Sequence, residues 1–382
     1  MFINKINNIF KVFKENSNEN FEFKDKTQEK LKIKDRINKY DNLKGLAIIL
    51  VVLGHILVSF ENYSIYYSLR DIIFVFHMPI FFFVAGYFSK TSYSSRIKAF
   101  KSLIIPFFLF GAFYYIFRFF LDGDIPTAPF VIPPRGLWFL LSLFLMKLFL
   151  PIFKKVKHMF WISLALALII GIFDLTNNIM GLTKTLCFLP SFLLGYYFKN
   201  SYEYLNDLKP TCRNILLKVR DFIVNNKKLI LLFLILCLLA VTYLTNGFSH
   251  QNFIFELSYH EMDLGNTIGM LMRLFIISAG LIITLLLTYL MTNKKTFLTK
   301  IGRNSLAIYI LHFYFIKFSQ IFISKTSIGN LIESNVFFIA IYLSIVVGLI
   351  VAILSRDFVS KTIKELIDIV NKLLFGFNIN NS

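Results

Sequence analysis

Two ionisable side chains lie on one predicted membrane-spanning helix of this chain. The segment "DNLKGLAIILVVLGHILVSF", residues 41 to 60, is apolar enough to cross a bilayer, yet it contains Lys44 near its start and His55 in its second half. The two positions are eleven apart, close to three full helical turns, so both fall on one stripe about 16 Å apart along the axis. Because an ionisable group is costly in hydrocarbon, the pair predicts a functional site.

Two further histidines lie in predicted spans. His77, in "FHMPIFFFVAGYF", is near the outer end of the second span, at the level that His55 reaches in the first. His312, in "NSLAIYILHFYF", is near the middle of the ninth span. Three imidazoles can therefore approach one another inside the bundle. A ring that titrates near neutral pH can take a proton from a hydroxyl and return it, which favours a general base.

Each histidine could also have a purely structural role, as a buried ring bonded to a helix carbonyl or hydroxyl. Metal binding is a weak alternative, because the three histidines lie on three separate helices with no carboxylate in the same spans. We therefore expect no metal. Pro79, two residues after His77, frees a helix carbonyl, and His77 is a candidate partner for it.

Composition indicates the scaffold that positions these residues. Apolar residues make up 56% of the 382 positions and charged residues 16%, and the mean hydropathy is +0.65. We expect an all-α polytopic helix bundle in the cell membrane. About ten spans are predicted, at residues 45–61, 72–88, 102–121, 137–153, 159–175, 185–198, 229–246, 267–292, 304–323 and 334–354.

The basic residues predict the orientation of these spans. The loops assigned to the inner side hold 33 lysines and arginines, and the opposite loops hold only 4: Arg70, Arg135, Lys184 and Lys325. The positive-inside rule then places both termini in the cytoplasm. This topology explains the net charge of +19 better than a nucleic-acid partner does, because the basic residues are scattered and no base-stacking module accompanies them.

The expected organisation has three parts: a cytoplasmic tail over residues 1–40, a membrane domain over 41–355 and a cytoplasmic amphipathic tail over 356–382. Apolar residues recur every three or four positions in "MFINKINNIFKVF", "RNILLKVRDFIV" and "KTIKELIDIVNKLL", a pattern typical of helices on a membrane surface. The three cysteines lack the spacing of a zinc or redox site and are expected to be packing residues.

Five motifs in order resemble the integral-membrane acyltransferase 3 family, in particular its fucose 4-O-acetylase-like branch. They are "DNLKGLAIILVVLGH", "FHMPIFFFVAGYF", "GLWFLLSLF", "LPSFLLGYYF" and "SLAIYILH", and the resemblance covers about residues 40–355. It implies transfer of an acyl group, usually acetyl from cytoplasmic acetyl-CoA, to a hydroxyl of a cell-surface glycan, a lipid-linked sugar or a small metabolite.

The family hallmark is a basic residue, ten intervening positions and a histidine, which Lys44 and His55 match. Lysine replaces the commoner arginine and offers a point charge in place of a planar fork. With His55 as the general base, His77 would orient or assist it. Cations at the inner mouth would hold the phosphates of coenzyme A, or else would only set the topology. These cations are Lys44, Arg96, Lys98 and Lys101.

Three residues are candidates for acceptor binding. Trp138, at the outer end of the fourth span, is either an interface anchor or a platform for stacking a sugar. Arg118 either snorkels to the headgroups or lines the acceptor site, and His312 is the third candidate. Three other basic residues within spans are expected to snorkel or to pair inside the bundle: Lys147, Arg273 and Lys317.

The rival class is a transporter or flippase of lipid-linked sugars or polysaccharide. Such a protein also needs many spans and polar groups at mid-depth, but it needs no coenzyme A. A receptor or scaffold ranks last, because the sequence carries no appended interaction domain. The identity of the acceptor, the acyl chain, direct transfer against a covalent intermediate, and the oligomeric state are left open by the sequence.

Overall fold

The computed structural model describes residues 37–60, 62–123, 130–134, 136–174, 176–201, 214, 218, 222, 225–244 and 251–376. The chain divides into two units, Met1–Ile37 and Asn38–Ser382, and the helices below belong to the second. Arg135 and the two amphipathic segments before residue 224 fall wholly or almost wholly outside the described residues. The division into tails and membrane domain stays a prediction.

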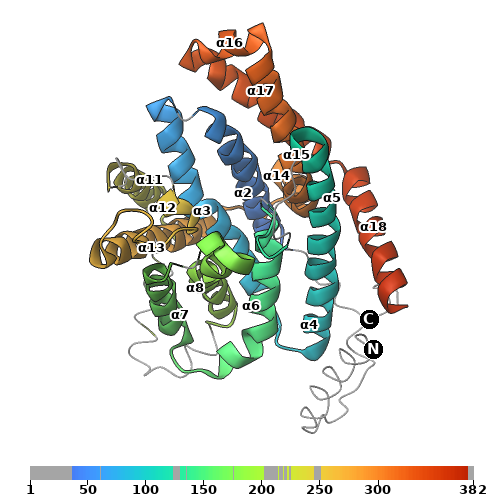
Figure 1. Cartoon of the computed structure of the whole chain (residues 1–382). Coiled ribbons are helices and arrows are strands. Elements are labelled where there is room, and N and C mark those ends of the chain that lie inside the picture. The colour runs from blue at the N-terminus through green and yellow to red at the C-terminus, as the bar shows by residue number, and fades with distance from the viewer. Residues whose placement is uncertain are drawn as a thin grey trace. The chain divides into compact units, whose positions relative to one another are not determined.

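The described part of the chain folds into helices and contains no strand (Figure 1). A helix lies in each of the ten apolar windows. The helices are α2 (Asn38–Leu57), α3 (Ser64–Tyr87), α4 (Tyr93–Ala99), η3 (Phe100–Ile104), α5 (Ile105–Asp122), α6 (Trp138–Lys155), α7 (Met159–Ile169), α8 (Leu182–Lys199), α11 (Lys227–Leu244), α12 (Gln251–Ile254), α13 (Asn266–Leu290), α14 (Phe297–Arg303), α15 (Ser305–Lys325), α16 (Ser327–Glu333), α17 (Val336–Leu354) and α18 (Asp357–Phe375).

Eight of the described helical segments are long and apolar enough to cross a bilayer. Two predicted spans fall outside this set: α6, which carries Lys147, Lys154 and Lys155, and α7, which is short even with the single turn η4 (Ile170–Ile172). The expected all-α, multi-pass membrane fold is confirmed. The count of ten spans and the side on which each terminus lies stay predictions.

Glycines allow the central helices to approach closely. A Cβ on Gly86 of α3 would lie 1.9 Å from the carbonyl oxygen of Phe192, and one on Gly195 of α8 would lie 1.9 Å from that of Phe83. The two contacts are reciprocal, because a glycine of each helix lies against a backbone carbonyl of the other. Small residues at helix crossings are typical of membrane bundles, where close packing replaces the hydrophobic effect.

A polar network fixes the start of α2 against α14. The side chain of Asn42 is fully buried; its Nδ2 donates to the carbonyls of Thr292 and Lys294, at 2.9 and 3.0 Å. Its Oδ1 accepts from the hydroxyls of Thr296 and Thr299, at 2.9 and 2.6 Å. A buried amide with its donors and acceptor satisfied holds one geometry, so this network sets the position of α2 along α14.

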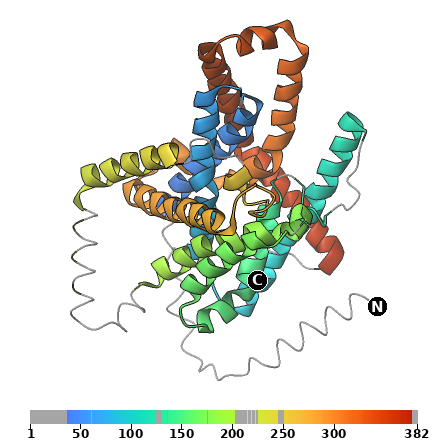
Figure 2. The same ribbon diagram turned by 60° about the vertical axis from the view of Figure 1, so that its left-hand side comes forward.

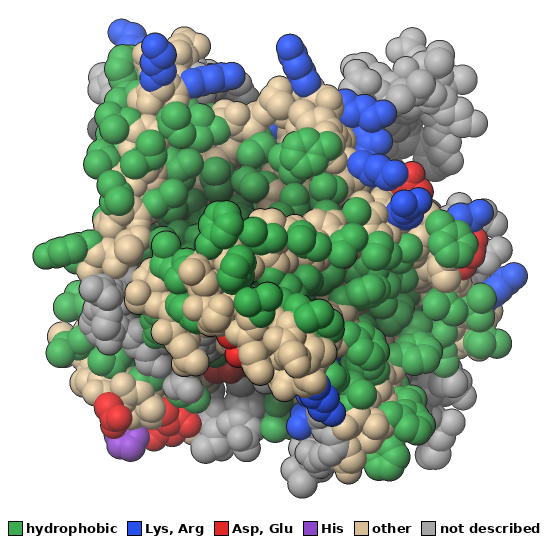
Figure 3. Space-filling view, turned by 90° about the horizontal axis from the view of Figure 1, so that it is seen from above, with side chains coloured by type: hydrophobic (Ala, Val, Ile, Leu, Met, Phe, Trp, Pro, Cys, Tyr) green, Lys and Arg blue, Asp and Glu red, His purple; other side chains and the backbone are tan. Residues whose placement is uncertain are grey.

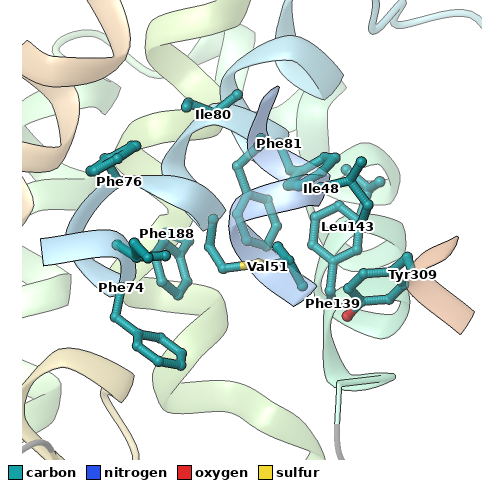
Figure 4. Close-up of a cluster of buried hydrophobic side chains, with 14 of the residues drawn as sticks. Ile48, Val51, Phe74, Phe76, Ile80, Phe81, Phe139, Leu143, Phe188 and Tyr309 are labelled. Carbon is teal, nitrogen blue, oxygen red and sulfur yellow. The ribbon is translucent and has the colours of Figure 1, made fainter. Parts of the chain in front are cut away.

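Aromatic side chains fill the space between the helices that carry the site. Figure 4 shows Phe81, Phe139 and Phe188 among the buried residues of this cluster. Phe82 stacks on Phe188, with ring centroids 5.2 Å apart and planes inclined by 14°, and packs edge-on against Phe139. Such pairs add stabilisation beyond the area they bury. They join α3, α6 and α8 into one rigid wall.

The C-terminal segment forms the amphipathic helix α18, which contacts η3 and the first turns of α5 (Figure 1). Figure 2 shows the same helices from another side. Ile363, Ile367 and Asn371 are buried, and the Asn371 amide donates to the carbonyl of Lys101 at 3.5 Å. Part of the stripe predicted to lie on the membrane therefore contacts the protein. Viewed from above, hydrophobic side chains cover most of the surface, and lysines and arginines gather near its edges (Figure 3). So broad an apolar surface suits a bilayer.

Candidate active site

A cavity of about 750 Å³ lies between α2, α3, α5, α6, α8 and α15. Its volume is in the range of pockets that hold small-molecule ligands. A segment that we call the acidic loop (residues 253–264), which contains three carboxylates and no lysine or arginine, closes part of its wall. Four of the sequence-predicted site residues line this cavity: His55, His77, Arg118 and Trp138.

His55 and His77 reach the cavity from neighbouring helices. The ring of Phe74 lies edge-on to both, with centroids 5.6 Å from His55 and 4.9 Å from His77. The Nδ1 of His77 lies 2.8 Å from the carbonyl oxygen of Ile73, one helical turn earlier. A carbonyl oxygen only accepts, so Nδ1 carries the proton and Nε2 keeps its lone pair. In this tautomer His77 can accept a proton at Nε2.

The partner that we expected for His77 was wrong. Pro79 lacks an N–H and therefore frees the carbonyl of Val75, four residues earlier. His77 bonds the carbonyl of Ile73 instead. Gly280 of α13 approaches the Val75 oxygen closely enough that a Cβ there would lie 2.5 Å from it. The exposed carbonyl is thus covered by a neighbouring backbone.

His312 lies behind His55 and does not line the cavity. Their ring centroids are 5.4 Å apart, and the ring of Phe313 contacts both. The His312 side chain is fully buried, and its Nδ1–H is shared between the carbonyls of Tyr309 and Ile308, at 2.8 and 3.0 Å. Its Nε2 is buried with no hydrogen-bond partner among the described residues. The expected approach of the histidines is therefore found, with His312 on the side away from the cavity.

The cations predicted to hold coenzyme A lie away from the cavity wall. Lys44, Arg96, Lys98 and Lys101 are absent from its lining. The Nζ of Lys44 forms an ion pair of 3.0 Å with Asp41, which Arg303 also approaches at 3.5 Å. Arg96 lies over the ring of Tyr93, and its Nε is buried without a hydrogen-bond acceptor in the part of the chain that the structure describes.

Trp138 forms one wall of the cavity together with residues of α8. The ring of Phe188 stacks beside the indole, at 5.6 Å with an interplanar angle of 22°. The Nζ of Lys184 lies 4.8 Å from the centre of the indole, in a cation–π contact. Lys317, which we expected to snorkel or pair in the bundle, also lines the cavity.

Sequence reasoning did not predict the ion pair on this wall. Lys184 on α8 pairs with Glu256 of the acidic loop, and both line the cavity with Glu261. The partners are 72 positions apart, and each had been counted only as a loop charge. The signal available was an acidic outer loop without lysine or arginine, in a chain whose outer loops hold only four basic residues, Lys184 among them.

Arg273 on α13 holds the acidic loop in place. Its Nη2 donates to the carbonyl of Leu257 at 3.1 Å, and its Nη1 to that of Ala167 on α7 at 3.4 Å. Tyr259 stacks on the guanidinium at 4.7 Å and donates its hydroxyl to the carbonyl of Leu168 at 2.8 Å. Burial raises the pKa of Tyr259 to about 12, so this hydroxyl stays a donor at neutral pH. Arg273 thus pairs inside the bundle.

Within the described residues, no group of three His, Cys, Asp or Glu side chains could hold a metal ion. His55 and His77 offer acid–base chemistry to the cavity. Its wall combines proton acceptors, an aromatic face and side chains of both charges. Such a wall can bind a polar molecule that carries hydroxyls and can remove a proton from one of them.

Comparison with known proteins gives two matches. A family model described as "Acyltransferase domain" matches residues 37–355. The Nodulation protein NolL of Sinorhizobium fredii (strain NBRC 101917 / NGR234) is 30% identical over 183 residues, which are 43% of this chain and 49% of that protein. The chain thus spans about half the length of this curated relative. No solved structure matches the chain.

Proposed function

The chain belongs to the integral-membrane acyltransferase 3 family, and from this premise we propose that it is an O-acetyltransferase of the cell envelope. The donor is cytoplasmic acetyl-CoA, and the acceptor is a hydroxyl of a cell-surface glycan or a lipid-linked sugar. A histidine of the cavity acts as the general base. The fucose 4-O-acetylase-like branch remains the expected subgroup.

The observation that carries this proposal is the presence of His55 and His77 in the wall of one cavity. In the reaction, the acceptor oxygen attacks the thioester carbonyl while a histidine nitrogen takes the hydroxyl proton. The carbon–sulfur bond then breaks, and the leaving thiolate receives that proton. We assign the proton transfer to His55, with His77 assisting through its Nε2. Holding the thioester and the hydroxyl together contributes much of the acceleration.

The size of the cavity bears on how the donor is held. At about 750 Å³ it can take an acetylated pantetheine arm and a sugar ring. We assign the phosphates to cations away from the cavity wall. Arg96 suits this role because its Nε–H lacks an acceptor among the described residues. Lys44, Lys98 and Lys101 complete the proposed donor site.

The test is an acetyl-transfer assay with purified protein in detergent, radiolabelled acetyl-CoA and a cell-envelope glycan extract. Wild type is compared with His55→Ala. We expect transfer by the wild type and a loss of about 100-fold or more in the variant, the usual scale of general-base catalysis. Gel filtration and thermal unfolding show whether the variant is folded.

Two outcomes would contradict the proposal in different ways. Equal labelling by a folded His55→Ala protein would remove His55 from the mechanism. No labelling by either protein would favour the rival class, a transporter or flippase of lipid-linked sugars. A transport assay in proteoliposomes would then test that class directly.

A further inference from the structure

Lys184, Glu256 and Trp138 form an acceptor subsite that, we propose, binds an uncharged sugar ring with two neighbouring hydroxyls. The subsite rests on the proposed function, since it gives the acceptor sugar a place in the cavity. Sequence reasoning had assigned Lys184 and Glu256 no role. The structure brings them together on the wall that contains Trp138.

The two charged partners are unequally buried. The side chain of Lys184 is 8% exposed, whereas that of Glu256 is 42% exposed. A buried ammonium needs a counter-charge, so the carboxylate neutralises Lys184 while one side of it stays accessible. The same ammonium lies over the indole of Trp138, 4.8 Å from its centre. Polar groups and an aromatic ring thus meet at one point of the wall.

These three groups match the chemistry of a sugar ring. A carboxylate can accept hydrogen bonds from two adjacent hydroxyls, and an ammonium can donate to a hydroxyl or to the ring oxygen. The indole offers an apolar surface for the C–H face of the ring. Lys184, Glu256 and Trp138 can all contact one hexose, and the charges of Lys184 and Glu256 stay paired with each other.

The local charge selects against an acidic sugar at this position. Glu256 already neutralises Lys184, and Glu261 adds a second carboxylate to the same wall. A sugar carboxylate placed here would meet the like charges of Glu256 and Glu261, which costs binding energy. The other cations of the cavity, Arg118 and Lys317, belong to α5 and α15 and suit a charge elsewhere on the acceptor.

The loop that supplies Glu256 is held rigidly. Arg273 binds the carbonyl of Leu257, the next residue, and the backbone N–H of Tyr259 donates to the carbonyl of Gly171 at 2.7 Å. Glu261 accepts from the backbone N–H of Ser258 at 2.8 Å. A loop with its backbone groups satisfied positions its carboxylates before the ligand arrives, which favours selective binding.

Trp138 provides a direct readout of binding that does not depend on catalysis. The chain contains only two tryptophans, and the second, Trp161 on α7, is 64% exposed. In a Trp161→Phe protein reconstituted in nanodiscs, the fluorescence comes from Trp138 alone. The probes are the methyl glycosides of a neutral hexose and of the matching hexuronic acid, titrated separately.

We expect a saturable change in fluorescence with the neutral glycoside and binding at least about tenfold weaker with the hexuronate. The double variant Lys184→Met, Glu256→Gln removes both charges together, so no unpaired buried charge remains. It should weaken binding of the neutral glycoside about tenfold and raise its KM in acetyl transfer without raising that for acetyl-CoA. The control Asp263→Asn changes an exposed residue of the same loop that does not line the cavity, and it should bind like the parent.

Three results would overturn the subsite: no saturable change with the neutral glycoside, tighter binding of the hexuronate, or unchanged binding in the double variant. Other results would reject the proposed function without rejecting the subsite. Saturable binding of the neutral glycoside without any acetyl transfer would keep the subsite and reject the transferase. Transfer to the glycoside with no response at Trp138 would reject the subsite and keep the transferase.

Discussion

The imidazole ring of His312 lies behind that of His55, with their centroids 5.4 Å apart and their planes inclined by 35°. Of these two histidines, only His55 lines the cavity. The Nδ1 proton of His312 is used by two helix carbonyls, so its buried Nε2 lone pair is the group left to interact with a neighbour. An acceptor beside the proposed base can stabilise the positive charge that the base gains on taking a proton. We infer that His312 positions and supports His55.

The first prediction concerns His312→Phe, which keeps a ring of similar size and removes the acceptor. The Nε2 of His312 makes no hydrogen bond among the described residues, but one formed to protonated His55 would be worth about 1.5 to 3 kcal/mol. The kcat for acetyl transfer should therefore fall about 10- to 100-fold. The KM values for acetyl-CoA and acceptor should stay within about twofold, because His312 does not line the cavity.

Steady-state kinetics with both substrates distinguish this role from two others. A higher acceptor KM with unchanged kcat would indicate the substrate contact that sequence reasoning assigned to His312. Unchanged kinetics with a lower melting temperature would indicate packing alone. Either result would contradict a supporting role for His312.

The second prediction separates two roles of His77. His77→Asn places an amide donor near the position of Nδ1 and can keep the bond to the Ile73 carbonyl, whereas His77→Ala loses it. We expect both variants to lose transfer by about tenfold or more, because neither has a proton acceptor at the Nε2 position. The asparagine variant should be more stable than the alanine variant, by about 1 kcal/mol in thermal unfolding. Wild-type transfer by His77→Asn would show that His77 only braces its helix.

The local pattern of apolar residues was enough to predict the helices and the approach of His55 to His77. A helix lies in each apolar window. Spacing from the span ends predicted one level for His55 and His77, and the ring of Phe74 contacts both. The rotation of α15 was not predictable in this way. Its sequence, "SLAIYILHFYFIKFSQIFISK", is apolar on nearly every side, so no stripe indicates which face is buried. His312 was therefore assigned to the cavity, although it lies behind it.

Contacts between distant segments also could not be read from the sequence. Lys184 and Glu256 meet because Arg273 binds the acidic loop against α7 and α13. The periodicity of the sequence does not predict that contact. Lys44 shows that a contact between residues close in the sequence was also not predicted. Lys44 lies on α2, but it is absent from the cavity lining and its cation is paired with Asp41, three residues earlier, which Arg303 of α14 also approaches.

The third prediction tests the contact between α2 and α14. A Cβ on Gly302 would lie 1.8 Å from the carbonyl oxygen of Asp41 and 2.9 Å from the backbone nitrogen of Gly45. Both are backbone atoms, so Gly302→Ala must separate the helices and disturb the Asn42 network. We expect a loss of about 1 to 3 kcal/mol, measured as a lower melting temperature in detergent. Gly348→Ala is the control, because nothing lies within 4 Å of its added Cβ. Equal melting of the two variants would contradict the close contact.

The fourth prediction concerns Arg273, which joins the acidic loop to α7. Arg273→Lys keeps the charge but loses the planar fork that reaches the carbonyls of Ala167 and Leu257 together. The loop should then open more often, so amide hydrogen exchange should quicken at its backbone donors, Tyr259 and Leu264 among them. Because the loop carries Glu256, the acceptor KM should rise severalfold, while that for acetyl-CoA stays the same.

Arg356→Lys provides a matched control at an exposed arginine before α18 and should alter neither measurement. If exchange in the loop were unchanged in Arg273→Lys, the guanidinium would not be what holds the loop. If exchange rose but the acceptor KM did not, the loop would be mobile without contributing to acceptor binding. Only the two effects together support the idea that a buried arginine orders the wall on which the acceptor rests, since loop order and affinity then change through one interaction.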